Sequence, residues 1–175
     1  MSGSGRKIWD GGVKLSSADL NNFISEQVIY YYADAAARTA GIPVLSKGLM
    51  SYRADADIVE GYNGTRWVNM SGKQELNTQA GTAYAITQAD LSRLVRFTSG
   101  TAVNVTIGTG IANAGERVEI LQDGAGTVTI RPGVGVSLFG AGTAGTAYAL
   151  GLYEAASIYC VSSNSYRVIG NVRAV

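Results

Sequence analysis

Few side chains in this sequence could carry out chemistry, and the strongest limit is that its 175 residues include no histidine. Histidine is the commonest general base and metal ligand near neutral pH. Cysteine occurs once, at Cys160 within the apolar run 155–161, which favours a small buried side chain over a reactive thiol. Zinc sites and the Ser–His and Cys–His catalytic pairs are therefore excluded in their usual forms. We expect no cofactor and no metal.

Carboxylates are the remaining candidates for catalysis, as general acid and base in glycoside hydrolysis. The pairs to consider are Glu116 with Glu119, and Asp123 with Glu154. Such enzymes need two carboxylates facing each other across a cleft. Glu116 and Glu119 are three positions apart, so a strand would place them on opposite faces. We expect that the protein is not an enzyme.

Two further motifs are better read as structural. The group Asp55, Asp57 and Glu60 lacks the spacing of a calcium-binding EF-hand loop, which favours a solvated turn. Residues 140–145 read Gly-Ala-Gly-Thr-Ala-Gly, a literal match to the dinucleotide-binding fingerprint. That motif needs a strand before it and a helix after it, and the sequence predicts no such helix. We interpret it as a glycine-rich loop.

The C-terminal half predicts an all-β domain. Alternating β-branched residues are broken by glycine every six to ten residues in 115–172, a pattern typical of short strands with tight turns. A helical turn at 87–94 starts with Thr87 and has Asp90 three residues later, as in a capping box. Eight strands indicate a β-sandwich, a jelly roll or a small barrel. We expect them at 94–98, 103–107, 117–122, 127–131, 134–139, 147–150, 154–161 and 166–172.

The N-terminal part predicts one helix over 16–39, with Ser16 as its cap and Pro43 just beyond its end. Tyr30, Tyr31 and Tyr32 would place large side chains on nearly every side of this helix. A helix that is apolar all round is usually buried, which favours packing against other subunits. Its other apolar positions with helical spacing are Leu20, Phe23, Ile24, Val28 and Ala35.

A small β-meander should follow the helix, with strands at 49–52 and 58–62. Asn63-Gly64 predicts a two-residue hairpin turn into 65–68, on which Tyr62 and Trp67 can pack. Residues 71–81 read as a linker. The expected fold is thus mainly β: a region 1–81 with the helix and the meander, then a β-sandwich or jelly-roll-like domain over 82–175.

Composition favours self-association and argues against other partners. Only 15% of the residues are charged and the net charge is +1, without a basic stripe, so we expect no nucleic-acid binding. No apolar run of 18 residues predicts a membrane span. A surface so poor in charge suits a chain partly covered by other subunits, and we expect a homo-oligomer, specifically a homotrimer.

Two sets of residues are candidate contact sites. Ile8 and Trp9, an apolar pair in a polar leader, would join Leu20, Phe23 and the three tyrosines 30–32 at a subunit or particle interface. Tyr148, Tyr153, Tyr159 and Tyr166 could instead form a sugar-stacking surface, although tyrosines at strand edges are also ordinary rim residues of a core. Of these, Tyr148, Tyr153 and Tyr166 are the candidate glycan contacts. The alternative function is therefore a module that binds a host glycan.

Two stretches of the chain resemble bacteriophage virion proteins. The first comprises 9–22 (WDGGVKLSSADLNN), 36–43 (AARTAGIP), 48–52 (GLMSY) and 62–67 (YNGTRW), and is similar to the opening of small phage tail and head-surface proteins. The second comprises 86–90 (ITQAD), 94–97 (LVRF), 115–130 and 166–171 (YRVIGN), and resembles β-domains of phage fibres, tail tips and capsid decorations.

This resemblance implies a location on the virion, after assembly in the cytoplasm of the bacterial host. It implies major capsid or tail proteins as partners, with the N-terminal region as the attachment. Short length favours a capsid decoration protein, whereas the resemblance of 9–22 and 62–67 favours a minor tail or tail-fibre protein. Both locations stay open on the sequence.

Overall fold

The fold is described from a computed structural model, which covers residue 16 and residues 29–42, 44–140 and 147–175. The chain forms two compact units that meet between Lys73 and Gln74. The expected boundary was at residue 81, and the segment 71–81 expected to be a linker contains a strand, Leu76–Gln79. We describe each unit by itself.

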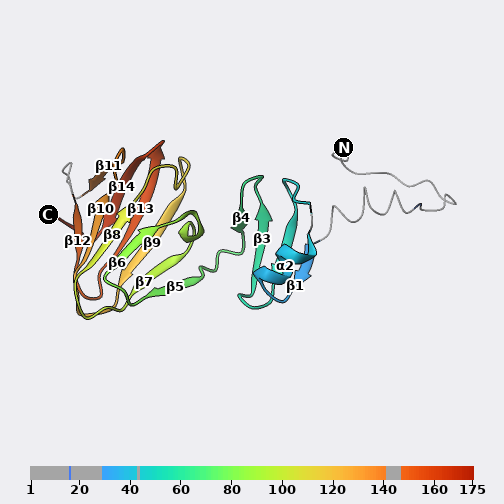
Figure 1. Cartoon of the computed structure of the whole chain (residues 1–175), viewed down its shortest axis with the longest axis horizontal. Coiled ribbons are helices and arrows are strands. Elements are labelled where there is room, and N and C mark those ends of the chain that lie inside the picture. Colours follow the sequence, from blue (N-terminus) through green and yellow to red (C-terminus); the bar gives the residue numbers. More distant parts are fainter. Residues whose placement is uncertain (1–15, 17–28, 43, 141–146) are drawn as a thin grey trace. The chain divides into compact units, whose positions relative to one another are not determined.

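The first unit is a four-stranded sheet with one short helix. The strand order in this sheet is β1-β2-β3-β4. β1 runs parallel to β2, and the other neighbours are antiparallel (Figure 1). In chain order the elements are β1 Ile29–Tyr32, α2 Ala35–Gly41, β2 Met50–Arg53, β3 Ile58–Tyr62 and β4 Trp67–Asn69.

The prediction of one helix over 16–39 is wrong at Ile29–Tyr32, which is a strand, and among the described residues it agrees with the structure only at 35–39, within α2. A β-branched residue followed by three tyrosines fits a pleated surface better than a helix, and pairing with β2 stabilises it there. The helix α2 begins only at Ala35, where the Asp34 Oδ1 accepts a hydrogen bond of 2.7 Å from the Ala37 amide. Residues 17–28, which include Leu20 and Phe23, lie outside the described residues, as do Ile8 and Trp9.

The β-meander is confirmed, but the hairpin turn differs from the expectation. Tyr62 pairs with Trp67, so the loop has four residues rather than two. The Asn63 Oδ1 accepts hydrogen bonds of 2.9 Å from the amides of Thr65 and Arg66, and Gly64 takes a φ of +99°. This side-chain turn competes with the two-residue turn that Asn-Gly usually favours. The predicted aromatic contact is confirmed, with the Tyr62 and Trp67 ring centroids 5.5 Å apart.

The second unit contains two sheets that share one core. The five-stranded sheet has the order β15-β12-β10-β8-β6, and the six-stranded sheet has the order β11-β14-β13-β9-β7-β5 (Figure 1). The eight predicted strands are all present, β8 and β9 with the predicted ends and the others with shifted ends, and β5, β6 and β15 were not foreseen. The elements are β5 Leu76–Gln79, β6 Ala83–Ile86, η3 Gln88–Asp90, β7 Leu94–Phe97, β8 Val103–Ile107, β9 Arg117–Gln122, β10 Val128–Pro132, β11 Ser137–Gly140, β12 Tyr148–Leu150, β13 Ala155–Ser162, β14 Ser165–Gly170 and β15 Arg173–Ala174.

The winding of these strands is that of a β-solenoid, and the predicted sandwich or jelly roll is wrong in this respect. From β5 to β10, successive strands alternate between the two sheets, and within each sheet they pair in parallel. Jelly rolls and immunoglobulin-like sandwiches are built from antiparallel strands. The alternation of residues along a strand reports which side chains are buried, but not the direction of the neighbouring strand. Antiparallel pairing appears only in later strands, as between β13 and β14.

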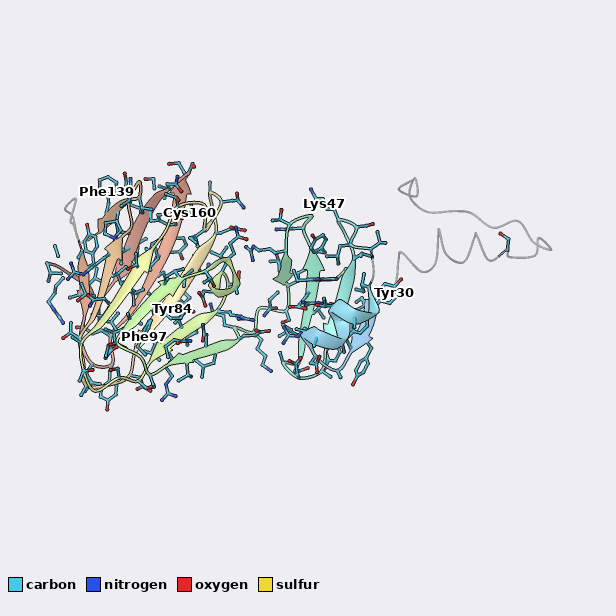
Figure 2. The ribbon with its side chains drawn as sticks, viewed as in Figure 1. Tyr30, Lys47, Tyr84, Phe97, Phe139 and Cys160 are labelled. Carbon is cyan, nitrogen blue, oxygen red and sulfur yellow. The ribbon has the colours of Figure 1, made fainter. Side chains whose placement is uncertain are left out.

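The core follows the alternation along each strand. In β8, for example, Val103, Val105 and Ile107 are buried while Asn104 and Thr106 are exposed. Figure 2 shows Tyr84 and Phe97 within this unit, and their ring centroids lie 5.7 Å apart in an edge-to-face contact. Cys160 is buried as predicted, and burial raises the pKa of its thiol. It therefore acts as a small apolar side chain.

A buried carboxylate closes one end of this core. Asp90 is 1% exposed, and its Oδ1 accepts hydrogen bonds from the Asn77 amide nitrogen at 2.7 Å and the Tyr84 hydroxyl at 2.8 Å. Asn77 and Tyr84 lie on β5 and β6, the edge strands of the two sheets. Asp90 also accepts a hydrogen bond of 2.8 Å from the Thr87 amide, which confirms the predicted capping box. The network is a polar cap over the first turn of the solenoid.

Glycines allow successive turns of the solenoid to stack closely. A Cβ atom on Gly126 would lie 1.9 Å from the carbonyl oxygen of Thr101, in the turn before β8. Gln122, which is fully buried, donates hydrogen bonds from its Nε2 to the carbonyl oxygens of Gly124, at 2.7 Å, and Gly126. The side-chain amide thus holds the turn that the glycines bring into contact with its neighbour.

We expect Gly126→Ala to destabilise the second unit by about 3 kcal/mol or more, because the added carbon overlaps backbone that can move only by separating two turns. The measurement is thermal unfolding followed by circular dichroism. Gly100→Ala is the matched control, since a Cβ atom there meets no heavy atom within 4 Å. Equal melting temperatures for the two variants would contradict the close stacking.

The stability of the second unit should fall as the pH rises from about 10 toward 12. Burial and the adjacent Asp90 raise the pKa of Tyr84 from 10.0 to about 12. The folded state therefore holds this proton at pH values where the unfolded chain has lost it, and the stabilisation is present below pH 10 and lost above it. Urea midpoints measured across this range should fall less steeply for Tyr84→Phe. Tyr153→Phe, at an exposed site, should keep the wild-type slope.

Candidate interaction surface

The register of the first unit sorts its side chains onto two faces of the sheet. Paired residues on neighbouring strands point to the same side, and the side alternates along each strand. One side, here called the helix face, is covered by α2 and carries Tyr30, Tyr32, Ser51, Arg53, Ile58, Glu60, Tyr62, Trp67 and Asn69. The other side, here called the open face, carries Ile29, Tyr31, Met50, Tyr52, Val59, Gly61, Val68 and Met70.

The helix face is held mainly by charges. The Arg38 guanidinium of α2 forms an ion pair with Glu60 and lies 4.6 Å from the centre of the Trp67 ring. Arg53 reaches the same Glu60 carboxylate at 3.2 Å and Asp55 at 2.7 Å. Arg38, Arg53 and Glu60 are all buried. Glu60 is shared by both guanidinium groups, and Arg53 has Asp55 as a second partner; these contacts matter because a buried charge without a partner is costly.

The apolar content of this helix face is small. Among the described residues of the first unit, Ile58 is the only buried apolar side chain. A buried network of ion pairs contributes little net stability, because desolvation offsets most of the attraction. A sheet of this size therefore lacks the apolar burial that usually makes a domain stable by itself.

The open face is apolar and has no charged side chain. Tyr31 is 70% exposed, Met70 61% and Ile29 52%, and no described residue covers them. The Tyr31 and Tyr52 rings stack with centroids 5.8 Å apart, and the Tyr52 hydroxyl donates a hydrogen bond of 2.7 Å to Asp57 at the rim. A contiguous apolar surface rimmed by polar groups is typical of an interaction site.

The structure separates the three tyrosines predicted as interface residues. Tyr31 lies on the open face, whereas Tyr30 and Tyr32 are half-buried on the helix face, where Tyr32 packs under Gly41 of α2. Sequence reasoning missed Met50, Val59, Val68 and Met70 as members of the open face. The alternation of residues along 50–70 carries this information. Assigning each residue to a face of the sheet, however, requires knowing how the strands pair.

Two of the four tyrosines predicted to stack on a sugar are wrong, and a third, Tyr159, is half-buried on β13. Tyr148 is fully buried and Tyr166 is 2% exposed, both within the core of the second unit. They occupy inward positions of β12 and β14, so their rings cannot stack on a sugar. Tyr153 is 75% exposed in the turn between β12 and β13, where it has a φ of 63°. Among the tyrosines predicted to contact a sugar, Tyr153 is therefore the only one with a largely exposed ring.

The carboxylates considered for catalysis take part in local contacts. Glu119 forms an ion pair of 2.6 Å with Arg117, and Asp123 accepts a hydrogen bond of 2.6 Å from Arg96. Glu154 contacts Arg173 at 3.1 Å, and the Gly151 amide and this guanidinium lower the pKa of its carboxyl. Glu116 accepts a hydrogen bond of 2.8 Å from the Asn113 amide.

Nothing in the described part of the chain gathers three or more residues able to hold a metal ion. Of the glycine motif, residues 141–145 lie outside the described residues. In the parts of the chain that the structure covers, no helix has the length and hydrophobicity needed to cross a membrane.

We expect Glu60→Gln to destabilise the first unit by about 3–5 kcal/mol, because it leaves Arg38 and Arg53 buried without their shared counter-charge. The effect should appear as faster amide hydrogen exchange in β2 and β3. Asp57→Asn is the control, since the Asp57 side chain is 72% exposed. Unchanged exchange in Glu60→Gln would show that the ion pairs do not hold the helix face together.

Comparison with known proteins assigns no family to this arrangement: no protein-family model matches the chain, and no curated sequence matches it either.

Proposed function

We propose that this protein is a non-enzymatic structural subunit of a bacteriophage particle, and that copies of it assemble into a homotrimer through the open face. The observation that carries the proposal is that face: seven apolar side chains on one side of a sheet, while Ile58 is the only buried apolar side chain among the described residues on the other side. Covering the open face would supply the apolar burial that the first unit lacks.

A second copy of the chain is the occupant that fits this face best. The open face carries no charged side chain that could recognise a charged partner. An apolar patch is complementary to the same patch on another copy of the chain. A closed trimer, in which each copy contacts two others, supplies more contact per chain than a dimer.

The placement on a virion is supported by the resemblance of residues 9–67 to the openings of phage tail and head-surface proteins. The compact second unit, with its core complete, suits a part displayed on the capsid exterior as a decoration protein. A minor tail or tail-fibre protein is the alternative, and the copy number per particle separates the two: hundreds for a decoration and a few to tens for a tail component.

Light scattering coupled to size-exclusion chromatography should give the mass of a trimer for the full chain. Val59→Lys with Val68→Lys, which places two charges in the open face, should give monomers. Val134→Lys is the matched control, since Val134 is fully exposed in the second unit. Circular dichroism confirms that the double variant is folded. A monomeric wild-type protein, or a folded double variant that stays trimeric, would overturn the assembly through this face.

A further inference from the structure

A row of alternating aromatic and cationic side chains crosses the outer surface of the six-stranded sheet in the second unit. The register pairs Phe139 of β11 with Arg167 of β14, Arg167 with Tyr159 of β13, and Tyr159 with Arg117 of β9. All four point away from the core, since their strand neighbours Leu138, Tyr166, Val168, Ile158, Cys160 and Val118 are buried. We call these four residues the outer row.

The rings hold the two guanidinium groups in place. Arg167 lies 4.3 Å from the centre of the Phe139 ring, and Arg117 lies 5.7 Å from the centre of the Tyr159 ring. Such contacts orient a guanidinium without using its hydrogen-bond donors. Arg167 donates from Nη1 to the Tyr166 carbonyl at 3.1 Å, and Arg117 donates from Nε to Glu119 at 2.6 Å. The described residues supply no partner for the remaining N–H groups of either arginine.

The spacing of the two arginines fits an extended acidic ligand. Arg117 and Arg167 lie on strands separated by one other, β13, so their backbones are about 9.5 Å apart. A guanidinium recognises carboxylate or sulfate groups through paired hydrogen bonds. Along an extended polymer of uronic acids, carboxylates two sugars apart lie at about this separation. Ser137 and Ser165, paired beside the row, add hydroxyl groups that can bond to sugar hydroxyls.

We propose that the outer row binds an acidic polysaccharide, with Arg117 and Arg167 each holding one acidic group and the Tyr159 side chain lying between them. The site shares Tyr159 with the sugar-stacking tyrosines suggested by the sequence, but its acidic-group contacts come from Arg117 and Arg167, and it does not depend on the proposed assembly through the open face.

A single-stranded nucleic acid fits the outer row less well. Such ligands are bound by a continuous track of cations along the phosphates, with bases stacked on exposed aromatic faces. Here Glu119 offsets part of the charge of Arg117, and the guanidinium groups already lie over the Phe139 and Tyr159 rings. The row therefore favours recognition by hydrogen bonds over recognition by stacking.

The test is a titration of the full-length protein with alginate, a polymer of uronic acids, with neutral dextran and single-stranded poly(U) RNA as the comparison probes. We expect alginate to bind with an affinity that falls as salt is added. Arg117→Gln and Arg167→Gln should each weaken this binding by about tenfold or more. Arg131→Gln is the matched control, since Arg131 is exposed on β10 of the other sheet.

The absence of alginate binding, or equal affinities for the three variants, would overturn the proposal, as would tighter binding of dextran or of the RNA. Light scattering on the same samples gives the oligomeric state. A protein that binds alginate as a monomer would support the outer row while contradicting the assembly, so the two proposals fail separately.

Discussion

The close stacking of successive turns is the constraint on which the second unit depends. Gly126 lies against the backbone of Thr101, and the buried Gln122 amide holds the turn in that position. This contact fixes the spacing between successive turns of the solenoid. The spacing in turn fixes which residues are paired across each sheet. The inward row of valines and isoleucines and the outward row of aromatic and arginine side chains are two results of the same register.

The first unit differs, because Ile58 is the only buried apolar side chain among its described residues. Its helix face uses a buried carboxylate shared by two arginines, an arrangement that specifies geometry more than it adds stability. The exposed apolar side chains Ile29, Tyr31 and Met70 lie on the open face. The unit is therefore arranged as half of an interface, and we expect its folding and its association to be coupled.

The sequence predicted the elements of the second unit well because alternation along a strand is a local signal: 103–107 and 117–122 were found with their true ends. It could not predict parallel winding, which depends on contacts between strands far apart in the chain. Residues 29–32 failed for a related reason, since Ile29 and the tyrosines also fit helical spacing and only their pairing with β2 decides for a strand. Tyr148 and Tyr166 were misplaced because a tyrosine in an alternating strand gives no indication of which side faces the core.

The polar cap at β5 and β6 has a consequence for solubility. Each of these strands ends its sheet, so each presents one unpaired edge in the described part of the chain. A stack of parallel strands can grow by templating, in the way that amyloid fibrils elongate. A further turn added on this side would stack on the hydrogen-bonded side chains of Asp90, Asn77 and Tyr84, and not on an open apolar core. The cap thus removes apolar surface on which a further turn could gain burial.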